Sequence, residues 1–151
     1  SSFLNLKSKG VKEEDINVML MSDYGLKLYG NTVIVNPDFA AENPHLVKGF
    51  VRAIIRGWMD TIADPNSAID HLMQRNKIAR RNVELERLEM AIRDNVITAE
   101  VKERGFGDVE GKRLSESINQ VGLTYDFSNK PTAASVFTSE YLPTMSQRKV
   151  N

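Results

Sequence analysis

Apolar residues along this chain follow two different spacings. Residues 16–21 and 32–35 are short apolar runs, and the second is rich in β-branched side chains. Runs of this kind predict buried strands. After Pro44 the apolar positions recur at every fourth residue, which predicts one long amphipathic helix. Its stripe consists of Leu46, Phe50, Ile54, Trp58 and Ile62.

Capping and breaking residues predict further helices. Residues that commonly cap a helix N-terminus stand before four later segments: Asp64, Asn82, Thr98 and Asp108. Glycines that suit a helix end follow three segments: Gly10, Gly105 and Gly122. Strands are thus expected only in the first third of the chain, and mostly helices after it. Because two strands alone are marginally stable, we expect an α/β fold in which they join a larger sheet.

Composition removes several classes of function. The 151 residues include 20 basic and 20 acidic side chains, so bulk charge does not favour a nucleic-acid partner. There is no cysteine, and His45 and His71 lack the spacing of a metal or nucleophile motif. The sequence therefore predicts no catalytic residue, no metal site and no cofactor, and we expect that the protein is not an enzyme.

One polar loop stands out between the two predicted strands. Residues 22–31 gather a carboxylate, two phenols and an amide, on Asp23, Tyr24, Tyr29 and Asn31. In open α/β sheets, ligands bind beyond the carboxyl ends of the strands. We therefore take these four as candidate ligand-binding residues. The alternative is a polar turn that satisfies its own backbone.

Short motifs along the chain carry a family resemblance. In chain order they include Asp23-Tyr24-Gly25, Tyr29-Gly30-Asn31, Asn43-Pro44-His45-Leu46, Gly105-Phe106-Gly107-Asp108 and Tyr141-Leu142-Pro143. In this order and spacing the chain resembles periplasmic substrate-binding proteins of ABC importers. The family in question serves nitrate, sulfonates, taurine and thiamine-pyrimidine precursors. The resemblance implies the C-terminal portion of a two-lobed type II periplasmic-binding-protein fold.

The resemblance also implies a domain organisation and partners. Residues 1–31 would end the second lobe and carry the cleft loop, residues 32–143 would give the return strand and C-terminal helices of the first lobe, and residues 144–151 would form a flexible tail. Implied partners are a small-molecule ligand, a membrane permease and the missing N-terminal portion of the same protein. Phe50, Ile54 and Trp58 would be buried against the rest of the lobe, and the same stripe would be exposed without it. The implied location is periplasmic, or extracellular and lipid-anchored, with the signal outside this chain.

The implied function is solute capture between two lobes, for a small nitrogenous or sulfonate-like compound. The Asp23 carboxylate opposes a simple anion, whereas with Tyr24 and Tyr29 it suits a nitrogenous ring such as a pyrimidine. One alternative is a stand-alone helical protein-interaction module, in which the stripe at residues 46–62 docks a partner helix. A minor alternative is a thiamine-pyrimidine biosynthesis enzyme of the same family, although no histidine-bearing iron site is recognisable.

Overall fold

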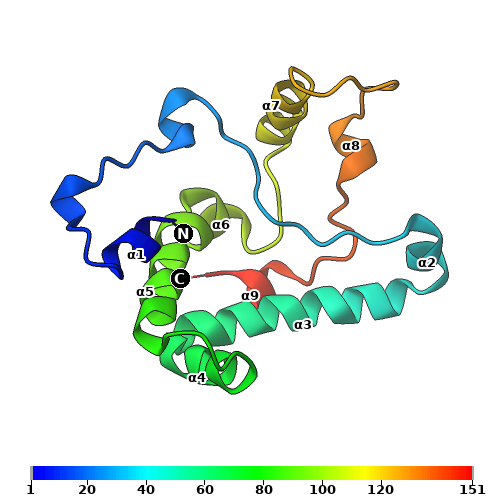
Figure 1. The fold of residues 1–151 in the computed structure, drawn as a ribbon. Helices are drawn as coiled ribbons and strands as arrows, with labels where there is room; N and C mark the ends of the chain where they lie inside the picture. The colour runs from blue at the N-terminus through cyan, green and yellow to red at the C-terminus, as the bar shows by residue number, and fades with distance from the viewer. Residues whose placement is uncertain (1, 151) are drawn as a thin grey trace. The chain divides into compact units, whose positions relative to one another are not determined.

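The computed structural model describes residues 2–150, drawn as a ribbon in Figure 1. These residues divide into two compact units. The first combines the residues up to Met19 with Arg56–Ala99, and the second combines Leu20–Ile55 with the residues from Glu100 onward. The boundary falls within the longest helix, α3, Pro44–Ala63. None of the described helices combines the length and apolar character of a membrane span.

The expected α/β fold is wrong, because the described residues form helices and no sheet. Ile16 and Leu20 do have extended backbone angles, but the segments between helices lack strand pairing. Val18 is 54% exposed and Ile34 is 88% exposed. An extended segment becomes a β-strand only where an adjacent segment pairs with it through backbone hydrogen bonds. Residues 32–35, predicted as a strand, therefore have no regular secondary structure, and the described residues contain no sheet.

The first unit contains α1 (Ser2–Lys7), α4 (Pro65–Arg75), α5 (Arg81–Ala91), the 3₁₀ turn η1 (Glu13–Asp15) and the π-helical turn η3 (Ile92–Val96). Its core is formed by side chains that are at least nine-tenths buried: Leu4, Ile69, Val83 and Ile92. Helices α4 and α5 pack against each other. Lys7 of α1 forms an ion pair with Glu86 of α5, at 2.7 Å from Nζ to Oε1.

The second unit contains η2 (Met21–Tyr24), α2 (Pro37–Glu42), the first part of α3, α7 (Gly111–Val121), α8 (Ala133–Val136) and α9 (Met145–Arg148). The short helix α6 (Ala99–Arg104) also belongs to it from Glu100 on. Its core consists of Ala40, Val47, Ile55, Phe106 and Val150.

Capping chemistry decides where several helices begin and end. Asp64 caps α4 by accepting a hydrogen bond from the Ser67 N–H at 3.0 Å, as predicted. Gly105 ends α6 with a positive φ of 76°, also as predicted. Helix α7 starts later than expected, because Glu110 and not Asp108 caps it. Helix α2 was not expected at all, and Asn36 caps it through the N–H groups of Asp38 and Phe39.

The stripe on α3 is helical, as predicted, but much of it faces solvent. Phe50 is 58% exposed and Trp58 is 37% exposed, whereas Val47 and Ile55 are buried. The side of the helix that packs in this chain is therefore the flank of the stripe. Whether a further part of the protein covers Phe50 and Trp58 stays a prediction.

The segment expected to be a flexible tail holds part of the core. Among residues 144–150, α9 forms a helical turn and Val150 is only 6% exposed. Arg148 donates hydrogen bonds from this turn to the loop after α6. Residue 151 lies outside the described residues, and the proposed domain boundaries stay a prediction.

Candidate functional site

The four candidate residues lie in different surroundings on one segment of the second unit. Asp23 and Tyr24 belong to the 3₁₀ turn η2, which Gly25 closes with a φ of 91°. The Tyr24 side chain is 71% exposed. Neither Asp23 nor Tyr24 forms a side-chain hydrogen bond or ion pair with another described residue. Asn31 is also exposed, whereas Tyr29 is half-buried.

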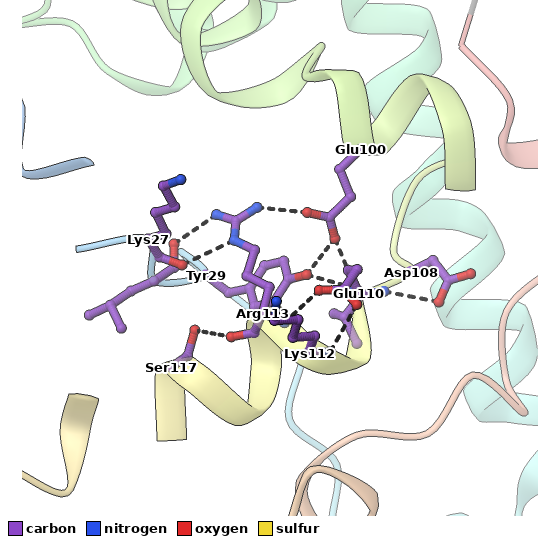
Figure 2. A network of polar contacts seen from close by, with 10 residues as sticks. Lys27, Tyr29, Glu100, Asp108, Glu110, Lys112, Arg113 and Ser117 are labelled. Carbon is purple, nitrogen blue, oxygen red and sulfur yellow. Dashed lines mark hydrogen bonds and ion pairs between the residues drawn. The ribbon is translucent and has the colours of Figure 1, made fainter. Parts of the chain in front are cut away.

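Tyr29 is the one candidate that the structure draws into a polar network (Figure 2). Its hydroxyl donates to Oε1 of Glu100 on α6 and accepts from the Glu110 N–H at 2.7 Å. The guanidinium of Arg113 lies over its ring, with Cζ 4.2 Å from the ring centroid. The hydroxyl proton of Tyr29 is therefore committed to Glu100, and one ring face is covered by a cation.

Arg113 connects this network to the loop. Its Nη1 donates to Glu100 Oε2 at 2.8 Å, and its Nε and Nη2 donate to the carbonyl oxygens of Lys27 and Leu28 at 3.0 and 3.1 Å. Figure 2 shows Glu100 and Lys27 on opposite sides of the guanidinium. Further along α7, Gln120 Nε2 donates to the Gly25 carbonyl at 2.9 Å.

The residues of this network keep the same protonation states near neutral pH. Burial, and after it the hydrogen bond to Glu100, raises the pKa of Tyr29 to about 12. Burial works to raise the pKa of Glu100, but the hydrogen bonds from Tyr29, Arg113 and the Glu110 amide outweigh it and lower that pKa. The pKa of Glu110 is lowered by the N–H groups of Lys112 and Arg113. Glu100 is thus an anion and Tyr29 a neutral donor near pH 7.

We expect this network to make the free energy of unfolding depend on pH in the acidic range. A carboxyl whose pKa is lower in the folded state stabilises the protein above its unfolded pKa, and that stabilisation is lost as pH falls through the folded value. The free energy of unfolding should therefore decrease below about pH 4.5, the ordinary value for Glu100. Urea titrations at several pH values should show a smaller decrease in Glu100→Gln. Glu116→Gln is the control, because this exposed α7 carboxylate lies 4.0 Å from the ammonium of Lys112 and is outside the network. Equal pH slopes in wild type and Glu100→Gln would contradict the expectation.

Sequence reasoning found Tyr29 but missed the residues that hold it. Glu100 and Arg113 are 71 and more residues away in the chain, so no local spacing connects them to Tyr29. Glu110 was missed as a cap, because Ser, Thr, Asp and Asn are the usual N-cap residues and Asp108 stands two positions earlier. Among the described residues, no cluster of three His, Cys, Asp or Glu side chains could hold a metal ion.

A shallow depression lies elsewhere in the second unit. Its volume is about 300 Å³ and it follows the C-terminus of α7. The lining residues are Asn119, Gly122, Leu123, Tyr125, Asp126, Phe127 and Lys130. None of them is a candidate from the sequence, and the loop with Asp23 and Tyr24 does not line it.

Comparison with known proteins gives two matches that include the loop. Residues 2–68 match the family model described as NMT1/THI5 like. The riboflavin-binding protein RibY of Chloroflexus aurantiacus is 30% identical in an alignment that is 148 residues long. This alignment covers 93% of this chain. The chain spans 39% of the length of that relative. No solved structure matches the chain.

Proposed function

We propose that the chain is part of a substrate-binding protein of the NMT1/THI5-like family, which captures a small solute for an ABC importer, because residues 2–68 match that family model and a 30% identical relative is named as a binding protein. In this proposal the protein acts outside the cytoplasm, in the periplasm or anchored to the cell surface, and a membrane permease receives the ligand. Since the chain corresponds to 39% of the relative's length, an N-terminal portion of the same protein would supply further ligand contacts.

The capture is proposed to involve no chemical reaction on the ligand. The name of the relative describes a binding protein, and Tyr29, with a pKa of about 12, is a poor proton acceptor or donor at neutral pH. The minor alternative is the biosynthetic enzyme of the same family. It would require catalytic groups beyond the described network.

We propose a flat nitrogen-containing ring as the ligand, with riboflavin as the first compound to test. The observation that carries this proposal is the exposure of Tyr24 beside Asp23 on one turn, both with free side chains among the described residues. A ring N–H can donate to the Asp23 carboxylate while the ring stacks on Tyr24. Asn31 would add amide hydrogen bonds. Tyr29 would contribute through its position, because its hydroxyl already bonds Glu100.

Riboflavin titration of the full-length protein tests this proposal. Tyr24→Ala should weaken binding about 10- to 100-fold through lost stacking, and Asp23→Asn should weaken it about tenfold through the lost charge-assisted hydrogen bond. The dissociation constants are measured by calorimetry. Tyr125→Ala is the matched control, since this tyrosine of the same unit is 66% exposed and belongs to the segment after α7 and not to η2.

Two outcomes would contradict the ligand assignment. One is unchanged riboflavin binding in both Tyr24→Ala and Asp23→Asn. The other is tight binding of nitrate or taurine that Asp23→Asn does not affect, because an anion should be repelled by this carboxylate.

The exposure of α3 favours a second candidate function. Leu46 and Phe50, one turn apart, are 51% and 58% exposed, which suits a helix that docks a partner helix. In the solute-binding proposal the same side chains are covered by the remainder of a longer protein. The riboflavin titration separates the two functions, since a helical protein-interaction module is not expected to bind riboflavin.

A further inference from the structure

The segment that follows η2 is held by side chains of α7 and not by backbone pairing. Gln120 bonds the carbonyl of Gly25, and Arg113 bonds those of Lys27 and Leu28. Seven residues separate Arg113 from Gln120, so both lie on one face of α7, roughly 10 Å apart along its axis. An extended chain covers about the same distance from residue 25 to residue 28. The segment therefore lies antiparallel along this face of the helix.

Arg113 is itself fixed from several directions. Glu100 accepts from its Nη1, the Tyr29 ring lies under its guanidinium, and its backbone N–H is bonded by the Glu110 side chain. Each of the three guanidinium nitrogens donates a hydrogen bond, two of them to adjacent loop carbonyls. A lysine ammonium lacks the planar fork that spans such a set of acceptors.

We propose that Arg113 is a positioning residue for ligand binding. By holding the carbonyls of Lys27 and Leu28 on α7, it fixes where η2 presents Asp23 and Tyr24, and it does so without contacting the ligand. Gln120 assists at the Gly25 end of the segment. The inference rests on the proposed function, because it takes η2 as the element that meets the ligand.

The first experiment measures riboflavin affinity in the full-length protein. Arg113→Met should weaken binding about tenfold, and Arg113→Lys should not restore it. Arg52→Met is the matched control and should stay within about twofold. Arg52 is an exposed α3 arginine with no ion pair to another described residue. Because Arg113 is proposed to act by positioning Asp23 and Tyr24, its substitution should change affinity by no more than about twofold in an Asp23→Asn/Tyr24→Ala background. An equal loss in both backgrounds would overturn the proposal.

The second experiment needs no ligand. Hydrogen exchange should be about tenfold faster in Arg113→Met at the amides of Gly25 and Leu26, which bond Ser22 and Met21 carbonyls across η2. Exchange in α4 and α5 should be unchanged, and Arg52→Met should match wild type throughout. Unchanged exchange at η2 would overturn the positioning role. If the wild-type protein does not bind riboflavin, the ligand assignment fails, and the exchange measurement still decides whether Arg113 fixes the loop.

Discussion

Replacing Arg148 with methionine is expected to lower the free energy of unfolding by about 3–5 kcal/mol. The Arg148 side chain is only 13% exposed and pairs with Asp108 at 3.3 Å from Nη2 to Oδ2. It also donates to the carbonyl oxygens of Arg104, Phe106 and Pro143. Methionine keeps the apolar stem but leaves these carbonyls and a largely buried carboxylate without their donor.

Urea unfolding of the full-length protein measures this effect. Lys149→Met is the control, because it removes the same charge from the next residue, which is exposed and has no ion pair with another described residue. The control should change the free energy of unfolding by no more than about 0.5 kcal/mol. Similar losses in the two variants would show that Arg148 does not connect the C-terminal turn to the loop after α6.

The helices could be predicted from the sequence because their signals are local. Asp64 stands next to Pro65 at the start of α4, and Gly105 follows the last residue of α6. The four-residue period at residues 46–62 lies within α3. Helix α2 was missed although Asn36-Pro37 repeats the Asp64-Pro65 arrangement, because the pair was interpreted as the end of a strand. A cap and a proline at the first helical position are a helix start.

The strands could not be decided from local sequence, because a strand depends on a partner. Residues 16–21 and 32–35 have apolar, β-branched composition, yet Met21 begins a 3₁₀ turn and Ile34 is almost fully exposed. The four-residue turn η2 satisfies its own backbone groups through short-range bonds such as Asp23 N–H to the Leu20 carbonyl. Composition alone does not distinguish a paired strand from a short turn or from an unpaired, exposed segment.

The candidate site was only partly accessible to sequence reasoning for a related reason. The gathering of polar side chains at residues 22–31 drew attention to Tyr29, and it does join a network. Its partners Glu100 and Arg113 come from α6 and α7, which reach the loop only through folding. Whether Asp23, Tyr24, Tyr29 and Asn31 meet a ligand stays a prediction.

Gly105→Ala should lower the free energy of unfolding by about 2–4 kcal/mol, for two separate reasons. Gly105 has a φ of 76°, a left-handed conformation that costs a residue with a Cβ roughly 1–2 kcal/mol. A Cβ there would also lie 3.0 Å from the backbone oxygen of Arg148 and 3.0 Å from Met145 Sδ. Because the backbone oxygen cannot move without displacing α9, the added methyl group is poorly accommodated.

Two further substitutions separate these causes in the same urea measurement. Gly10 has a φ of 92° and open space around its Cβ position, so Gly10→Ala should show only the conformational cost, about 1–2 kcal/mol. Gly49 lies within α3 with nothing near, so Gly49→Ala should raise the free energy of unfolding by about 0.5–1 kcal/mol. If Gly105→Ala costs no more than Gly10→Ala, the close approach of Arg148 and Met145 to Gly105 contributes nothing. The C-terminal turn α9 would then be able to move away from α6. In that case Arg148→Met should no longer cause the large decrease expected in the free energy of unfolding.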